Sequence, residues 1–163
     1  MFIKYVYLAG ERMKISTRGR YAVRLMLDIA QNENEGEFVR VKDIAKRQDI
    51  SDKYLEQIIS SLKKAGFVKS LRGAQGGYCL SKKTKEYTVG SILRLTEGDL
   101  APVSCLEGGE FGCSRADGCV TVRLWSMIND AVNGVIDNVT LEDLIKWQEE
   151  MPYIADNKDC MQK

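Results

Sequence analysis

Histidine is absent from the 163 residues of the sequence. Its absence excludes Ser-His-Asp and Cys-His nucleophile arrangements and every metal site that needs an imidazole ligand. Long apolar runs are absent too, because no window approaches the ~18 uncharged residues of a membrane span and the apolar stretch at 2–8 is broken by Lys4. With 44% hydrophobic and 29% charged residues, the composition is that of a folded, soluble protein.

Cysteine is present, but its usage does not indicate a disulfide framework. The chain has 5 cysteines, an odd number, and no secretory signal. We therefore expect thiols or metal ligands in a reducing, cytoplasmic compartment. Nor do we expect an enzyme, because no nucleophile has an adjacent base and the run RGAQGG at 72–77 lacks both the full G-x-G-x-x-G pattern and the lysine of a phosphate-binding loop.

Charge is distributed unevenly along the chain. Residues 13–85 hold 16 Lys/Arg and 8 Asp/Glu, whereas residues 86–163 hold 6 Lys/Arg and 14 Asp/Glu. A basic half is typical of a polyanion partner, most often nucleic acid, and the acidic half cannot share that surface. The alternative, a chance imbalance between two solvated faces, is disfavoured by the size of the difference.

Residues 1–12 match nothing downstream, whereas a strongly patterned segment begins at Met13. The codons for residues 9–12 can spell a purine-rich ribosome-binding stretch. We therefore expect translation to start at Met13, which makes residues 1–12 a start-site extension; the alternative is an added N-terminal strand. The intact mass of protein made from its native locus tests this expectation.

Three helices are predicted between residues 17 and 65. Apolar residues recur at helical spacing in 17–31, a shorter helix follows at 41–47, and Ser51 is placed to cap a third helix over 52–65 that ends at Gly66. With the short link between the last two, this is a helix-turn-helix arrangement. The apolar stripes consist of Ala22, Leu25, Met26 and Ile29 in the first helix and Leu55, Ile58, Ile59 and Leu62 in the third.

A hairpin and a polar helix face complete the predicted DNA-binding domain. Residues alternate at 67–72 and 77–81 around a glycine-rich tip, which predicts a winged helix over 13–85 with Lys69 and Arg72 near the DNA backbone or minor groove. The exposed face of the third helix carries Lys53, Gln57, Ser60 and Lys64, with Tyr54 and Glu56 on its flanks. Gln57 can read adenine, Glu56 can accept from cytosine, and Tyr54 can reach phosphate or base. The predicted phosphate contacts are Arg18, Arg20 and Lys42.

Three cysteines lie in the glycine-rich loop predicted at 98–119, after a short helix at 89–95. Their C-x7-C-x5-C spacing fits neither the paired spacing of structural zinc nor a ferredoxin run. Because a polar loop has no core to fill, three thiols so close together favour a ligand or redox function over chance. The three residues are Cys105, Cys113 and Cys119.

A long amphipathic helix is predicted at 120–137. The first half of the chain is too small to bury its own core and also cover this helix, so we expect it to pair with its twin in a dimer; the alternative is packing within the monomer. A last helix, 141–150, opens with a capping box of Thr140 and Asp143, and residues 151–163 form a tail.

Several segments together resemble one family. They are MKISTRGRYAVRLMLDIA, SDKYLEQ followed by LRGAQGGY, the three-cysteine loop, and the LW-containing helix that leads to DNVTLEDL. They are similar to the bacterial iron-sulphur cluster regulators related to IscR, NsrR, RirA and CymR, over residues 13 to about 150. The cysteine triplet resembles the cluster-binding branch, since CymR-type members lack it. The resemblance implies a homodimeric transcription factor, usually a repressor, whose paired recognition helices read a palindromic operator.

The resemblance also implies roles for individual residues. Tyr54, Glu56 and Gln57 match base-reading positions, and Arg72 matches the minor-groove contact of the wing. The predicted DNA contacts are Arg18, Arg20, Lys42, Lys53, Tyr54, Glu56, Gln57, Arg72, Gly73 and Gln75. The predicted cluster ligands are Cys105, Cys113 and Cys119.

One part of the cluster site departs from the family pattern. IscR completes its site with a histidine three residues after the last cysteine, where this chain has Val122, and the aspartate used by NsrR matches a position near Arg20. The fourth ligand must then be a carboxylate such as Glu107, Glu110 or Asp117, another thiol, or a small molecule. A 2Fe-2S cluster with a weak fourth ligand is favoured, and a 4Fe-4S cluster with one exchangeable iron is the alternative.

The sequence thus predicts a mainly α fold. A winged helix-turn-helix DNA-binding domain at 13–85 precedes the cysteine-bearing loop and the dimerisation helices at 86–150. The predicted function is a cluster-controlled repressor of iron-sulphur cluster biogenesis or iron genes. The alternative is a cluster-free repressor of cysteine or sulphur metabolism, controlled by thiol oxidation, zinc or a partner enzyme.

Overall fold

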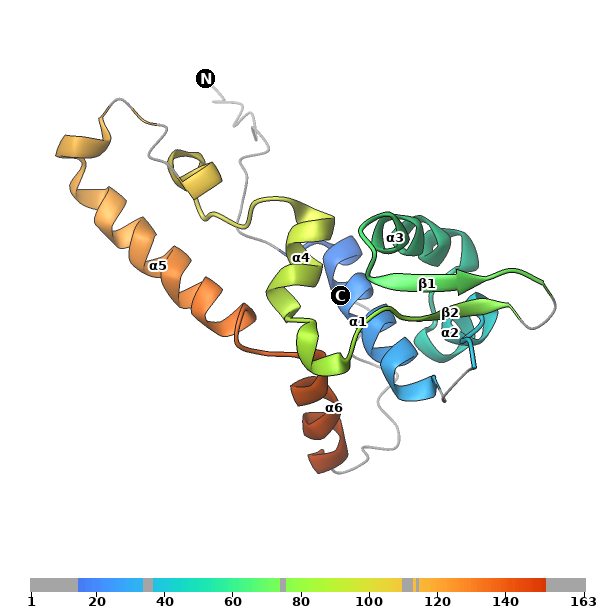
Figure 1. The fold of residues 1–163 in the computed structure, drawn as a ribbon. Helices are drawn as coiled ribbons and strands as arrows, with labels where there is room; N and C mark the ends of the chain where they lie inside the picture. Colours follow the sequence, from blue (N-terminus) through green and yellow to red (C-terminus); the bar gives the residue numbers. More distant parts are fainter. Residues whose placement is uncertain (1–14, 34–36, 74–75, 110–112, 114, 152–163) are drawn as a thin grey trace, which may run out of the picture.

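A computed structural model describes residues 15–33, 37–73, 76–109, 113 and 115–151. The segments predicted as a start-site extension, 1–12, and most of the predicted tail, 152–163, lie outside the described residues. The described residues form a winged body, from which one long helix projects (Figure 1). The mainly α fold predicted from the sequence is confirmed.

The first three helices form the helix-turn-helix arrangement. They are α1 (Thr17–Asn32), α2 (Val41–Gln48) and α3 (Asp52–Lys64). The Ser51 hydroxyl accepts a hydrogen bond from Tyr54 N at 3.4 Å, which confirms the predicted cap of α3. Between α2 and α3 the chain turns at Asp49, whose φ of 53° and ψ of 48° place it in the left-handed region and end α2 abruptly.

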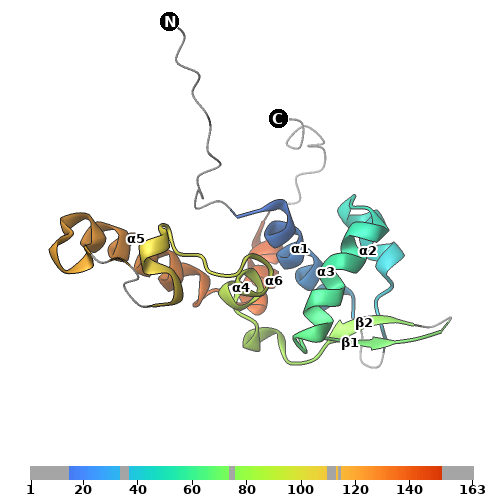
Figure 2. The same cartoon turned by 90° about the horizontal axis from the view of Figure 1, so that it is seen from above.

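The wing is a two-stranded antiparallel sheet of β1 (Val68–Leu71) and β2 (Gly77–Leu80). Val68 pairs with Leu80 and Leu71 with Gly77, so the strands run in register to the tip. Val39, just before α2, forms a bridge to Tyr78 that ties the wing to the helix-turn-helix. In Figure 2 the hairpin lies on the side of the body opposite α5.

Two more helices complete the body. The 3-10 turn η1 (Thr84–Glu86) leads to α4 (Val89–Glu97), and α6 (Leu141–Glu150) packs beside α1 and η1. The helix α4 continues beyond the predicted end at 95 to Glu97, and its capping residue Gly98 donates its backbone N–H to Arg94 O at 3.0 Å. The Thr140–Asp143 capping box that begins α6 is confirmed, with Asp143 N donating to the Thr140 hydroxyl at 3.2 Å.

Tyr87 connects the wing to the rest of the body. Its side chain is buried, and its hydroxyl donates to Phe67 O at 2.8 Å while it accepts from Ser81 N and Lys82 N at 3.0 and 2.8 Å. Its carbonyl accepts from Leu141 N at 3.0 Å, at the start of α6. One residue therefore fastens both ends of the hairpin and the last helix.

The core lies between α1, α3 and α4, and Asp28 is the one charged side chain buried among the described residues. The predicted stripes of α1 and α3 are its centre, since all eight of their residues are at most 1% exposed. The core cluster consists of Ala22, Leu25, Met26, Ile29, Val39, Ile44, Ala45, Ile50, Leu55, Ile58, Ile59, Leu62, Val68, Leu80, Tyr87, Ile92 and Leu141.

The helix α5 (Val120–Ile136) projects from the body (Figures 1 and 2). It has no buried residue; Leu124, Met127 and Val135 are 50%, 62% and 63% exposed, and Trp125 and Ile128 are half-buried. Before it, the segment predicted as a loop contains two 3-10 turns, η2 (Ser104–Gly109) and η3 (Ala116–Gly118). Among the described residues, no element covers the exposed apolar side chains of α5.

Candidate DNA-binding surface and cysteine loop

The predicted reading face of α3 is exposed in the structure. Lys53, Glu56 and Gln57 lie in the first turns of the helix and are all exposed, opposite the buried stripe. Tyr54 is half-buried, because its ring packs edge-to-face on Tyr21 at 5.9 Å between centroids. This contact holds one side of α3 against α1 and leaves the polar side free to enter a groove.

The three predicted phosphate contacts lie around α3. They differ in how far hydrogen bonds within the protein already hold their side chains. Arg18 donates from Nη2 to the Ser61 hydroxyl at 2.7 Å, so part of its guanidinium is used to join α1 to α3. Arg20 donates to the Thr17 hydroxyl at 3.3 Å within the first turn of α1. Lys42 is exposed in the first turn of α2.

At the wing, Arg72 and Gly73 are exposed at the end of β1, beside the exposed Lys69. Gly73 has a φ of 107°, a conformation that side chains rarely adopt, so a glycine is required where the hairpin turns. Gln75, also predicted to contact DNA, lies outside the described residues.

A buried ion pair that the sequence analysis missed supports the turn before α3. The Asp28 carboxylate is 2% exposed and accepts from the Arg47 guanidinium at 2.6 Å and from Gln48 Nε2 at 2.7 Å. Arg24 donates in turn to the side chain and the carbonyl of Gln48, at 2.9 and 2.8 Å. The hydrogen bond to Asp28 raises the pKa of Arg47. An aspartate beside an apolar stripe was the available signal, since such a carboxylate needs a partner.

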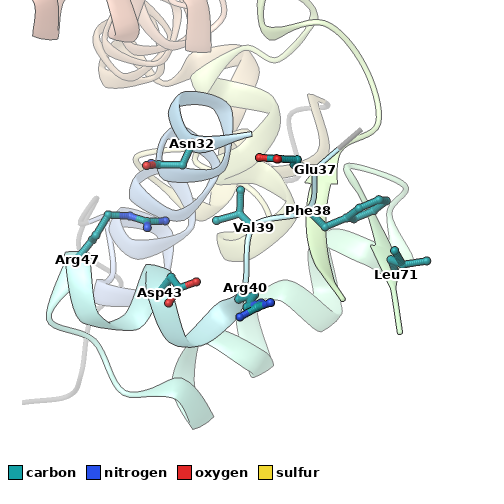
Figure 3. Close-up of a pocket in the computed structure, with 8 residues that line it drawn as sticks. All are labelled: Asn32, Glu37, Phe38, Val39, Arg40, Asp43, Arg47 and Leu71. Atoms are coloured by element: carbon teal, nitrogen blue, oxygen red, sulfur yellow. The ribbon is translucent and has the colours of Figure 1, made fainter. Parts of the chain in front are cut away.

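A groove of about 480 Å³ separates α2 from the wing. Figure 3 shows Arg47 and Asp43 on its α2 side and Phe38 and Leu71 on its wing side. The lining residues are Asn32, Glu37, Phe38, Val39, Arg40, Asp43, Arg47 and Leu71. Because this space is open, the wing is positioned by the Val39–Tyr78 bridge and by Tyr87 rather than by packing on α2.

The three predicted ligands lie in one stretch of chain between α4 and α5. Cys105 is in η2, Cys113 follows it, and Cys119 is the N-cap of α5; all three are half-buried free thiols. Within the described part of the chain, no three Cys, Asp or Glu side chains lie close enough to share a metal ion. The three thiols therefore share a loop but do not converge in this structure.

Local hydrogen bonds act on the chemistry of this loop. The Thr121 side chain and the Val122 backbone N–H lower the pKa of Cys119, because they stabilise its thiolate at the start of α5. At the other end, the Asp99 carboxylate accepts from Ala101 N at 2.8 Å and from Gly108 N at 2.7 Å, which lowers its pKa and fastens the turn that holds Cys105.

The family model of Rrf2, described as an iron-dependent transcriptional regulator, matches residues 15–147. The chain belongs to the Rrf2 family. As a member it is a transcriptional regulator that binds DNA, and the Rrf2 relatives found are regulators, not enzymes.

Two kinds of Rrf2 regulator are similar to the chain. The HTH-type transcriptional regulator CymR of Bacillus subtilis (strain 168) is 43% identical over 137 residues, covering 84% of this chain and 93% of CymR. The regulator IscR of Pectobacterium carotovorum subsp. carotovorum (strain PC1) is 39% identical over 148 residues, covering 91% of this chain and 88% of IscR. The solved structure of CymR, the global cysteine regulator of B. subtilis, matches with a TM-score of 0.69 and 42% identity, covering 82% and 97% of the two chains.

These matches confirm the family that the sequence motifs resemble and the winged-helix fold of the body. They do not distinguish the two modes of control, because IscR and CymR are similarly close. In the part of the chain that the structure describes, no helix combines the length and the apolar character needed to cross a membrane.

Proposed function

We propose that the protein is a homodimeric repressor that binds a palindromic operator and is controlled by an iron-sulphur cluster on Cys105, Cys113 and Cys119. The observation that carries the proposal is the position of these thiols. They occupy one loop at the free end of α5, outside the core, and each is reduced and half-buried. Buried packing therefore does not account for them, whereas ligation does.

The dimer is supported by the unpartnered face of α5. Val120 is 88% exposed and Leu124, Met127 and Val135 are at least half exposed, an apolar surface that a second copy of the same helix would cover. Gly134 on this helix has nothing within 4 Å of the place where a Cβ would stand, so the helix surface is open to close approach. A two-fold pairing of α5 would present two α3 helices to two half-sites.

The assignment of the reading surface rests on exposure and charge together. The exposed Lys53, Glu56 and Gln57 on α3 and the exposed Arg72 on the wing belong to the basic half of the chain. Gln57 and Glu56 are proposed to read base edges, Arg72 and Gly73 to follow the minor groove, and Arg18, Arg20 and Lys42 to hold phosphates.

The three thiols fit an iron-sulphur cluster in donor type, since thiolates are the ligands that such clusters use. The lowered pKa of Cys119 favours the thiolate form that ligation requires. The cluster, when bound, supplies a redox-active and labile group. A 2Fe-2S cluster is favoured, with 4Fe-4S the alternative. Since the thiols do not converge in the present arrangement, ligation would reorganise the segment between α4 and α5, and this reorganisation would alter how two recognition helices are presented.

The absorption spectrum of anaerobically purified protein tests the cluster, together with iron and acid-labile sulphide counted per chain. We expect absorbance between roughly 320 and 460 nm with matching iron and sulphide. Cys113→Ala should remove it and leave the fold intact, and Cys79→Ala, a matched change of a half-buried cysteine in the wing, should leave it unchanged. A colourless protein after reconstitution contradicts the cluster, and an unfolded Cys113 variant would show that the loop is structural.

The reading surface has its own test. Gln57→Ala should weaken binding to the operator by about 1–3 kcal/mol and relax specificity at one base pair. The matched change Lys64→Ala, on the same exposed face of α3, should mainly reduce the salt dependence. Affinity for operator and for unrelated DNA, measured over a salt series, separates the two effects. Equal losses on every DNA sequence in both variants would show that the reading face is wrongly assigned.

A second candidate function is control by the thiols themselves. Two observations favour it: among the described residues the cysteines do not gather as a ligand set, and the protein is 43% identical to CymR over 137 residues. In this case oxidation of the thiols, zinc or a partner enzyme would control the repressor. The absorption spectrum distinguishes the candidates, and DNA binding is common to both.

A further inference from the structure

The projecting helix α5 is attached to the body at one end. At its C-terminal end, the Arg94 guanidinium on α4 donates to both carboxylate oxygens of Asp137 at 2.5 and 2.9 Å. The same guanidinium donates to Asn133 Oδ1, one turn earlier, at 2.6 Å. A planar guanidinium that binds two side chains one helical turn apart fixes the orientation of that helix as well as its distance.

The surrounding backbone shows that this joint is closely fitted. Gly90 is buried on α4, and a Cβ at this position would overlap Asp137 Oδ1 and press on Ile136, so a larger residue would displace the side chains of the joint. Val89 N donates to Val139 O at 2.8 Å, and Thr88 forms a bridge with Thr140. The chain on both sides of the joint is therefore held.

The free end of α5 has no comparable support. Its first residue, Val120, is 88% exposed, and among the described elements the helix has further contacts with η2. A helix of 17 residues is about 25 Å long, so a rotation of roughly 10° at the joint would move its far end by about 4 Å. This displacement is similar to the rise of about 3.4 Å per base pair along DNA.

We propose that the fork of Arg94 on Asp137 and Asn133 sets the spacing between operator half-sites that the protein accepts. Arg94 is a positioning residue: it touches no DNA, and it fixes the angle between α5 and the winged body. In a dimer paired through α5, that angle determines the separation of the two α3 helices. The inference rests on the proposed dimer on a palindromic operator, and it adds the residue that selects spacing as distinct from base sequence.

The test uses the full-length protein and begins with the wild type. A pool of random duplexes is selected for binding, which gives the preferred half-site and the number of base pairs between the two half-sites. Affinity is then measured for duplexes in which this spacer is one or two base pairs shorter or longer. A second set carries single mismatches inside a half-site and keeps the spacer constant.

In the wild type, changing the spacer by one base pair should weaken binding by roughly tenfold, because DNA or protein must deform. Asp137→Asn and Arg94→Met should reduce that penalty to less than about threefold, while mismatches cost as much as in the wild type. Asp137→Asn keeps the shape of the side chain, so it tests the joint even if Arg94→Met folds poorly. Glu142→Gln, which removes the exposed Lys146–Glu142 pair at 3.1 Å on α6, is the matched control and should retain the wild-type penalty.

Two results would overturn the assignment: an unchanged spacer penalty in both joint variants, or a parallel loss of mismatch discrimination. Relaxed spacing in the Glu142 control would overturn it too, because the effect would then be general. If the wild type selects no paired half-sites, the proposed dimeric operator binding fails first, and this is visible before any variant is made.

Discussion

Helices α1 and α5 carry the same kind of apolar stripe, but only the stripe of α1 is buried. The stripe of α1 is 0% exposed at Ala22, Leu25, Met26 and Ile29, whereas Leu124 and Val135 on α5 are 50% and 63% exposed. The apolar residues recur with the same period in the two helices, so the difference in exposure comes from the elements that surround each helix. Among the described residues, the winged body buries the stripe of α1 whereas α5 keeps an exposed apolar face, and the proposed dimer would cover that face.

The largest expected effect, on the free energy of unfolding, comes from comparing a Leu→Ala substitution in each of the two helices. Leu25→Ala should lower the free energy of unfolding by about 2–5 kcal/mol, because it leaves a cavity in a fully packed core. Leu124→Ala should change the unfolding of the dissociated chain by less than about 0.5 kcal/mol. Urea unfolding at low protein concentration measures both. Similar losses in the two variants would show that α5 is packed within its own chain.

The second test concerns the association of two chains instead of the unfolding of one. Val135→Asp places a carboxylate in the proposed helix pair and should raise the dissociation constant of the dimer at least about a hundredfold, because the charge would be desolvated. The circular dichroism of the winged body should be unchanged. Sedimentation equilibrium measures the dimer, and Glu150→Gln, on the exposed end of α6, is the control. A variant that dimerises as the wild type does would place the interface elsewhere.

Tyr87, which connects the wing to the rest of the winged body, offers a smaller effect. Tyr87→Phe removes the hydroxyl that serves Phe67 O, Ser81 N and Lys82 N, and should cost about 1–3 kcal/mol of unfolding free energy. Calorimetry should show a lower melting temperature. Tyr78→Phe, in the half-buried β2, is the matched control and should cost less. Equal shifts of the melting temperature in the two variants would mean that these three hydrogen bonds add little to the stability.

The smallest expected effect compares one cysteine from each region. Hydrogen bonds lower the pKa of Cys119, whereas burial raises the pKa of Cys79 in the wing. Alkylation follows the thiolate, so the reaction of Cys119 should reach half its maximal rate at a lower pH than that of an ordinary cysteine, and Cys79 at a higher pH. Peptide mass spectrometry after timed alkylation between pH 6 and 10 measures both. Coincident profiles in the folded protein, as expected after denaturation, would show that the structure does not tune either thiol.

Local signals in the sequence were sufficient for most of the fold. The first helix was predicted at 17–31 and spans Thr17–Asn32, and the last was predicted at 141–150 and spans Leu141–Glu150. The helix caps at Ser51 and Thr140 can be predicted from the sequence, because a capping residue and its partner are three positions apart. Periodicity and caps are short-range properties, so a single sequence displays them directly.

The missed ion pairs join residues that are far apart in the chain. Asp28 and Arg47 are 19 positions apart, and Arg94 and Asp137 are 43 apart. No local pattern indicates such a partner. The turns η2 and η3 were missed for another reason, since a glycine-rich loop has no periodicity. The roles predicted for the DNA contacts and the cysteine ligands remain predictions, although the exposure of the reading face agrees with them.

The unequal charge of the two halves has a consequence for how the protein meets DNA. Residues 13–85 carry an excess of Lys/Arg and residues 86–163 an excess of Asp/Glu, so a chain that is almost neutral as a whole carries opposite charges on its two halves. Near a polyanion, this separation of charge favours approach by the basic half before any contact forms. Net charge close to zero therefore limits unspecific attraction, while orientation during diffusion is retained, and both effects weaken as the ionic strength rises.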